Sequence, residues 1–365
     1  MEKIGKSLGN FALKMLKGFI LETDTEPFSI DHSRIKNILI VIRHQMGDML
    51  CALPMMRSIR QFYPQANIIL VTKQSTRFNE IFKNNNSPAD EVIDFEHGFE
   101  NFINLVKELR DKKIDLAIIP STVTFSATNH LIAYYSHAKI KAGVKSFDYE
   151  KNKVSYLLNV KNDFVWGLKK VHQIERNLDI IRQINIKPSA DKISVTLTES
   201  QKEFAEDFLR QNNIDRNKKL VGFHPGAAKK GNVWAPAKFA ELGDKLFRKF
   251  NCNILISEGP DDTKYVNELE NLLKEKFNIL QIIRHKGFLM NNLALINLSD
   301  LFITNDTGIM HLASGLNVPE IALFGPTKAY EWGPVGDNKF SVQSSGISID
   351  NITIDMVYDA ALRLM

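Results

Sequence analysis

The sequence predicts an α/β protein with two tandem Rossmann-like, doubly wound domains that face a cleft. Short runs of branched aliphatic residues alternate with amphipathic segments, which is typical of buried parallel strands joined by helices. The alternation occurs in two series along the 365 residues, and a chain of this length exceeds what one hydrophobic core usually supports. Ligands of such sheets bind beyond the carboxyl ends of the strands, so we expect the site there.

The order of the patterns divides the chain into three parts. Residues 1–33 form an amphipathic N-terminal extension, residues 34–190 the first Rossmann-like domain and residues 191–365 the second. The pattern allows the last helix of the second domain to pack back on the first domain.

The first series predicts four strands, three helices and two less regular stretches. The strands are expected at residues 37–42, 67–72, 91–95 and 115–120. Helices are expected from the end of a loop at residues 43–48 to Tyr63, where Pro64 follows, and at residues 99–112 and 174–183. A charged stretch at residues 146–170 interrupts the alternation and is expected to be irregular.

The second series predicts five strands, with helical patterns between them. Strands are expected at residues 220–223, 252–257, 278–283, 301–304 and 320–324. Pro236 stands where a helix would open, at a position that favours proline.

Composition excludes several classes of protein. Hydrophobic residues make up 44% and charged residues 24% of the chain, and no apolar run is long enough to cross a bilayer. The net charge of +5 is spread out, which argues against a nucleic-acid partner but suits small anions or an anionic membrane surface. Cys51 and Cys252 lie far apart in apolar stretches, so we expect buried thiols in a reducing compartment.

The first twenty residues predict a cationic amphipathic helix. Apolar residues recur at helical spacing, with lysines at positions 3, 6, 14 and 17 largely on other faces. Because lysines interrupt the apolar run, the segment does not resemble a cleaved signal peptide. It is suited to the headgroup region of an anionic leaflet. Packing on its own domain or on a partner is the alternative.

Two strand-to-helix turns carry candidate functional groups. Asp306 or Thr307 can cap a helix, Gly308 allows a ligand to approach the backbone, and His311 lies one turn further on. Free N–H groups at this turn suit a diphosphate. Asp48 follows Gly47 at the corresponding turn of the first series, where a carboxylate could take a proton from a hydroxyl. Ordinary helix capping and a packed core histidine are the structural alternatives.

A third candidate is the loop that follows residues 220–223. It contains Gly226, Lys229, Lys230 and Asn232, and its lysines could balance the charge of a leaving nucleoside diphosphate. A basic surface loop is the alternative. The chain has no Asp-x-Asp motif, no metal-spaced Cys/His cluster and no Walker loop, so no metal site is expected.

Taken in order, these motifs resemble glycosyltransferase family 9, the ADP-heptose:lipopolysaccharide heptosyltransferases, which have the GT-B fold. The matching blocks are residues 38–43, 47–50, 52–54, 172–178, 224–234, 305–311, 323–327 and 332–334. The resemblance implies inverting transfer of heptose from ADP-heptose to a lipopolysaccharide core acceptor, without cofactor or obligatory metal.

The resemblance also implies roles for individual residues. Asp48 matches the family's proposed base, in an acceptor-side loop with Arg43 and Gly47. On the donor side, Thr307, Gly308 and His311 match diphosphate-binding positions, and Asp306 would contact the donor sugar or orient its loop. Asp261 lies near the family's ribose-binding acid, with Asp262 as a competitor. These residues come from the motifs named above and from the Glu258-Gly259-Pro260 turn.

One position departs from the family's pattern. Asn232 stands two residues before Trp234, where the family usually has lysine or arginine. Lys229 or Lys230 could compensate, or the donor could differ. Two alternatives therefore stand beside heptose transfer: a related enzyme with another nucleotide-sugar donor or epimerase activity, and a non-catalytic nucleotide- or glycan-binding scaffold. The expected partners are a nucleotide sugar and a lipid-linked saccharide, at the inner face of the cytoplasmic membrane.

Overall fold

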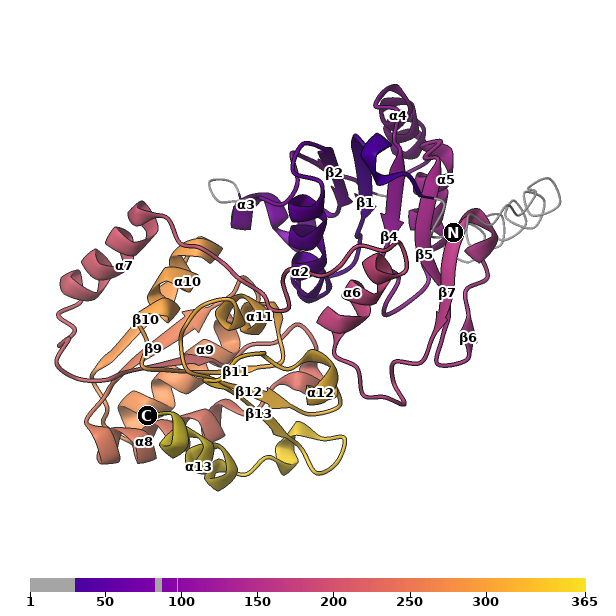
Figure 1. Ribbon diagram of the computed structural model, residues 1–365. Helices are drawn as coiled ribbons and strands as arrows, with labels where there is room; N and C mark the ends of the chain where they lie inside the picture. The colour runs from indigo at the N-terminus through magenta and orange to yellow at the C-terminus, as the bar shows by residue number, and fades with distance from the viewer. Residues whose placement is uncertain (1–29, 83–86, 97) are drawn as a thin grey trace. The chain divides into compact units, whose positions relative to one another are not determined.

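The computed structural model describes residues 30–82, 87–96 and 98–365. Within them the chain forms two compact units (Figure 1). The first takes the described residues up to Phe78 and Ser87–Asp191, and the second takes Lys192–Met365 with the short segment that begins at Asn79. The predicted helix of residues 1–20 lies outside the described residues.

The first unit is built on a mostly parallel sheet. In the described part of the chain its strand order is β3-β2-β1-β4-β5-β6, with β7 also beside β5. The pairs are parallel except β5–β6, which is antiparallel. The strands are β1 (Asn37–Val41), β2 (Asn67–Thr72), β3 (Glu91–Asp94), β4 (Leu116–Ile119), β5 (Ile140–Phe147), β6 (Glu150–Lys151) and β7 (Val160–Phe164).

Helices cover both faces of this sheet (Figure 1). They are α2 (Met46–Phe62), α3 (Phe78–Phe82), α4 (Phe99–Asp111), α5 (Ala127–Tyr135) and α6 (Gln173–Arg182). Leu39 and Val41 of β1 share a core with Leu109 of α4. Ile38 and Ile40 point to the opposite face and are also buried, which is why the strand reads as a continuous apolar run.

The second unit repeats this plan with a fully parallel sheet. Its strand order, over the described residues, is β10-β9-β8-β11-β12-β13. The strands are β8 (Leu220–His224), β9 (Asn253–Glu258), β10 (Ile282–Lys286), β11 (Leu301–Asn305), β12 (Glu320–Phe324) and β13 (Lys339–Gln343). The helices are α7 (Glu199–Gln211), α8 (Pro236–Phe250), α9 (Thr263–Asn271), α10 (Leu289–Asn297), α11 (Gly308–Ser314), α12 (Ala329–Trp332) and α13 (Ile354–Leu364).

The core of the second unit explains where its helices lie. Phe239 and Leu246 of α8 join Phe223 of β8 in one apolar cluster, and Val357 of the last helix, α13, belongs to the same cluster. Pro236 is the first residue of α8, as predicted. The last helix therefore contributes to the core of the second unit.

Two sequence expectations about regular structure are wrong. The strand expected at residues 278–283 is observed as β10, Ile282–Lys286. It begins later because the preceding helix continues as a π-turn at Leu272–Lys276 and Asn278 then turns the backbone with φ 54°. The stretch at residues 146–170 is not irregular throughout, since it contains the end of β5, β6 and β7.

The burial expected for the two cysteines agrees with the structure. Cys51 and Cys252 are both buried. Among the residues that the structure describes, we find no helix long and apolar enough to cross a membrane.

Candidate active site

In both sheets most candidate residues follow the strands at which the strand order reverses direction. In the first unit the chain passes from β1 to β2 and β3 on one side, and then returns to β4 on the other side of β1. In the second unit β8 and β11 stand in the same relation. Loops that leave such neighbouring strands run in opposite directions and open a crevice at the carboxyl edge, where doubly wound proteins bind ligands. The predicted site loops follow β1, β8 and β11.

Asp48 lies inside a helix and not in a loop. Helix α2 begins at Met46, so the loop expected at residues 43–48 is shorter than predicted. The reason is a capping box, in which the backbone N–H of Gln45 donates to Oδ2 of Asp48 at 3.0 Å. Asp48 thus caps the helix, while its carboxylate remains partly exposed. Because a carboxylate has two oxygens, capping through one does not prevent proton transfer at the other.

Arg43 is a buried residue. Its guanidinium lies 4.5 Å from the centre of the Phe95 ring, and Nη1 donates to Oδ1 of Asn129 at 3.5 Å. Burial lowers the pKa of Arg43, and the charge of Glu96 opposes that effect. Since arginine remains protonated at any ordinary pH, Arg43 supplies a fixed positive charge between β1 and α2.

His44, between Arg43 and Asp48, was missed in the sequence. Burial lowers the pKa of its imidazole, and the Asp48 carboxylate opposes the fall. The signal that could have found it is its position in the loop after β1, four residues before the candidate base. A neutral histidine beside a carboxylate can accept or donate a hydrogen bond there.

Asn305, at the end of β11, connects the two loops of the second unit. The residue is fully buried. Its Nδ2 donates to the carbonyl of Pro225 at 2.9 Å, and its Oδ1 accepts from the backbone N–H of Trp234 at 3.1 Å. One amide therefore holds both ends of the loop that follows β8.

We call these two hydrogen bonds of Asn305 the Asn305 frame, and Asn232 lies in the loop that they hold, in contact with Asp306. Nδ2 of Asn232 donates to Oδ2 of Asp306 at 2.9 Å. Burial raises the pKa of the Asp306 carboxyl, and hydrogen bonding from Thr327, the charge of Lys229 and the bond from Asn232 oppose the rise. Lys229 and Lys230 are exposed, so their ammonium groups are available to a ligand.

Helix α11 begins at Gly308, with Thr307 as its N-cap residue. Of the two capping candidates, Asp306 and Thr307, the structure places Thr307 at the N-cap position, and its hydroxyl makes no capping hydrogen bond there. The side chain of His311 is buried and its ring packs edge-on against Trp332, with 6.2 Å between ring centres. This burial and this ring contact agree with the packed-histidine alternative.

The two acidic residues after β9 differ in burial. Asp261 is exposed, whereas Asp262 is buried, accepts from the backbone N–H of Gly259 at 3.0 Å and lies 3.4 Å from Nε2 of His224. A side chain at Gly226 would collide with the Asp262 carboxylate, so glycine at this position makes room for that acid. The structure therefore joins Asp262, and not Asp261, to the loop after β8.

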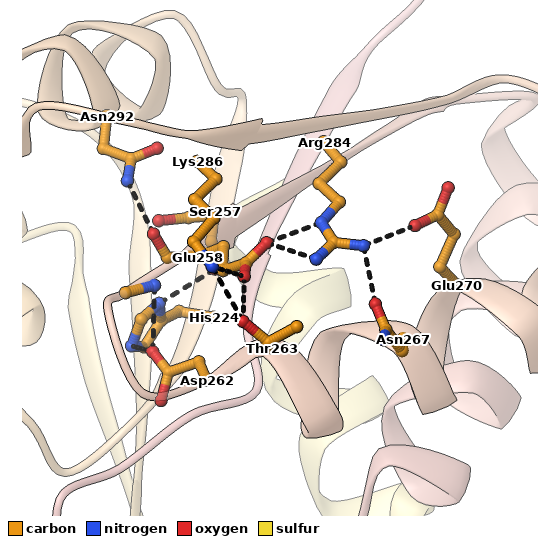
Figure 2. Close-up of polar contacts among 11 residues, drawn as sticks. His224, Ser257, Glu258, Asp262, Thr263, Asn267, Glu270, Arg284, Lys286 and Asn292 are labelled. Carbon is orange, nitrogen blue, oxygen red and sulfur yellow. Dashed lines mark hydrogen bonds and ion pairs between the residues drawn. The ribbon is translucent and has the colours of Figure 1, made fainter.

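Glu258, which no sequence motif indicated, is the centre of a polar cluster beside Asp262 (Figure 2). Its side chain is fully buried and accepts from Nε of Arg284 at 2.6 Å and from Oγ1 of Thr263 at 2.6 Å. Nζ of Lys286 lies 3.0 Å from the same carboxylate. Burial tends to raise the pKa of Glu258, but these hydrogen bonds and charges outweigh it and lower the value. The cluster fixes the carboxyl ends of β9 and β10.

Among the residues described, we find no group of three or more His, Cys, Asp or Glu side chains that could hold a metal ion.

The two doubly wound units form the α/β fold of two-domain glycosyltransferases of the GT-B type. Residues 102–350 match the profile of glycosyltransferase family 9 (heptosyltransferase), and the chain belongs to this family. Lipopolysaccharide heptosyltransferase 3 of Escherichia coli is 25% identical over 304 residues, which cover 80% of this chain and 84% of that protein.

Two solved structures show the same fold. The glycosyl transferase family 9 protein of Veillonella parvula has a TM-score of 0.74 at 19% identity, covering 90% of this chain and 97% of that one. The E. coli heptosyltransferase WaaC, solved with ADP, has a TM-score of 0.65 at 18% identity, covering 90% and 97% of the two chains.

Proposed function

We propose that this chain transfers heptose from ADP-heptose to a hydroxyl of a lipopolysaccharide core saccharide, with inversion at the anomeric carbon. The observation that carries the proposal is the family match, together with an acid and a donor loop at the ligand-binding edges of the two sheets. The relatives named above are a lipopolysaccharide heptosyltransferase and a heptosyltransferase solved with ADP, and they suggest the donor.

The second unit holds the donor in this proposal. Thr307, Gly308 and His311 line the diphosphate at the start of α11, where backbone N–H groups favour an anion. Lys229 and Lys230 are exposed and add positive charge for the leaving ADP. Gly226 and the acid at Asp262 or Asp261 hold the ribose side of the nucleotide.

The first unit supplies the base. The acceptor hydroxyl attacks the anomeric carbon while Asp48 takes its proton, the bond from that carbon to the phosphate oxygen breaks, and ADP leaves with the bonding electrons. Arg43, which follows β1, and Gly47, in the first turn of α2, shape the strand-to-helix turn that presents Asp48. No covalent enzyme intermediate, cofactor or obligatory metal takes part, because the charge of the leaving diphosphate is balanced by lysines and backbone N–H groups.

The decisive experiment combines donor binding with product analysis. ADP-, UDP-, GDP- and CDP-sugars are compared by thermal shift, since a ligand at a hundredfold its Kd stabilises by about 2.7 kcal/mol. ADP-heptose is then incubated with and without a deacylated core acceptor, in buffer with and without EDTA. We expect ADP release and a longer saccharide only with acceptor, and equally with EDTA.

Each alternative predicts another outcome. An altered sugar without acceptor would indicate an epimerase, and a stronger shift with UDP-, GDP- or CDP-sugars would indicate another donor. Nucleotide binding without turnover of any donor would support a non-catalytic scaffold, for which Asn232 in place of a basic residue is the favouring observation.

The lipid-linked acceptor leads us to place the enzyme at the inner face of the cytoplasmic membrane as a peripheral protein. The cationic amphipathic pattern of residues 1–20 supports this location.

A further inference from the structure

The side-chain amide of Asn232 is buried, and its nitrogen is hydrogen-bonded while its oxygen is not. The residue is 4% exposed. Its Nδ2 faces three acceptors, namely Oδ2 of Asp306 at 2.9 Å, the carbonyl of Asp306 at 3.4 Å and Oγ1 of Thr327 at 3.5 Å. Its Oδ1 is buried and has no hydrogen-bond partner among the residues that the structure describes. Buried acceptors without a donor are rare in folded proteins and call for an explanation.

Asp306 determines that the oxygen of the Asn232 amide, and not its nitrogen, lacks a hydrogen-bond partner in the described structure. If the amide were rotated by half a turn, Oδ1 would lie against the Asp306 carboxylate, where two acceptors repel each other, and Nδ2 would lose its bond. The Asn305 frame prevents the loop from moving away, because it holds Pro225 and Trp234 on either side of Asn232. The unpaired oxygen is therefore built into the site.

The chemistry of the unpaired oxygen decides what can bind to it. Oδ1 of an asparagine only accepts hydrogen bonds, and so do the oxygens of an ionised diphosphate. A phosphate cannot satisfy Asn232, whereas a sugar hydroxyl, which donates, can. The exposed amines of Lys229 and Lys230 in the same loop remain suited to the phosphates. The loop thus has separate groups for the sugar hydroxyl and for the phosphates, whereas a basic side chain at position 232 could contact both.

We propose that Asn232 accepts a hydrogen bond from a hydroxyl of the donor sugar, and that it determines sugar specificity instead of diphosphate affinity. This inference rests on the proposed function, since it requires a nucleotide-sugar donor in the second unit. Asp306, whose carboxylate orients Asn232, acts as a positioning residue in this pair. A donor that lacks the hydroxyl leaves Oδ1 buried without a partner and is disfavoured.

The first test compares ADP and ADP-heptose on wild type and Asn232→Leu by calorimetry. Leucine has nearly the shape of asparagine but no acceptor. We expect the Kd of ADP-heptose to rise about tenfold, the usual worth of one buried hydrogen bond, and the Kd of ADP to change by less than about twofold. Lys230→Met is the matched control in the same loop, and it should weaken ADP and ADP-heptose equally.

A second arm changes the ligand instead of the protein, so it does not depend on the folding of a variant. Monodeoxy analogues of ADP-heptose are titrated into the wild-type enzyme. One analogue should lose about tenfold in affinity, and Asn232→Leu should bind that analogue and ADP-heptose equally.

The outcomes that overturn the inference differ from those that overturn the proposed function. Equal losses for ADP and ADP-heptose in Asn232→Leu would assign the residue to the ADP part of the donor and not to the transferred sugar. Unchanged affinities, or no sensitive deoxy position in the wild type, would make the unpaired oxygen a purely structural feature. In all of these cases turnover of ADP-heptose by the wild type would still support the proposed function, and only its absence would count against that.

Discussion

At the scale of single residues, Asp48 has a structural and a proposed chemical role that one substitution separates. Asp48→Asn keeps an oxygen that can accept from the N–H of Gln45, so the helix start should survive. Only the ability to take a proton is lost. We expect normal folding and donor affinity, with turnover reduced by about a hundred- to ten-thousand-fold.

Steady-state kinetics beside ADP calorimetry measure this effect. Retention of more than about a tenth of wild-type turnover would leave Asp48 as a capping residue and direct attention to the side chains between β1 and α2, His44 first.

Gly226 offers a test of packing at the donor loop. A Cβ at this position would overlap the carboxylate of Asp262, which is itself held near His224 and Gly259. Gly226→Ala should lower the free energy of unfolding by about 1–3 kcal/mol, the usual cost of overpacking. Gly231→Ala is the matched control, because the nearest atom to its new Cβ lies 3.8 Å away.

Urea denaturation of both glycine variants gives the comparison. Equal stabilities for Gly226→Ala and Gly231→Ala would mean that the Asp262 carboxylate moves aside freely, and that it is not fixed as the distances indicate.

At the scale of elements, a buried ionisable pair joins β12 to β13. Glu320 and Lys339 are register partners on these strands, and Nζ lies 3.6 Å from Oε2, with both side chains almost fully buried. The ammonium donates to the carbonyls of Ala313, Leu316 and Val318 at 2.7–3.0 Å. Burial raises the pKa of Glu320 to about 8, and the Lys339 ammonium opposes the rise.

The raised pKa predicts how stability depends on pH. Between the ordinary glutamate value of 4.5 and about 8 the folded chain keeps a proton on Glu320 that the unfolded chain releases. The free energy of unfolding should therefore fall as pH rises through this window. Glu320→Gln removes the titration, so its stability relative to wild type should increase from about pH 5 to pH 8.

Denaturation of both proteins across that range is the measurement. Parallel stability profiles would contradict the assignment, and a variant that is much less stable at every pH would show that Glu320 is ionised and balances the charge of Lys339.

At the scale of the whole molecule, the amphipathic pattern of residues 1–20 predicts membrane binding by a segment outside the described structure. Each lysine near an anionic surface contributes about 1 kcal/mol, and the apolar stripe adds to it. Deletion of residues 1–20 should weaken co-sedimentation with phosphatidylglycerol-containing vesicles at least about tenfold. Turnover of a soluble, deacylated acceptor should not change.

Vesicles of pure phosphatidylcholine serve as the control for charge, and moderate salt as the control for screening. Equal sedimentation of the full and shortened chains on the anionic vesicles, at low and moderate salt, would remove the segment from any role at the membrane.

The sequence by itself determined most of the elements and the sheet edges at which the candidate residues lie. Apolar runs, proline positions and the two series of alternation are local signals, and they indicated β1, β8, β11 and the turns that carry Asp48 and Asp306. The reason is that periodicity depends on neighbours within one turn of a helix or a few residues of a strand. Where a local cue was weak, as at the π-turn before β10, the predicted boundary was wrong.

Tertiary structure alone decided which of the candidate groups meet. Asn232 bonds to Asp306, 74 residues away, and Asp262 rather than Asp261 enters the loop with His224 and Gly226. Neither pairing follows from local pattern, because adjacent acids look alike in sequence while only one faces the interior once β8 and β9 pair in register. Burial then decides their chemistry, since desolvation and hydrogen bonding act only on groups that the fold has brought together.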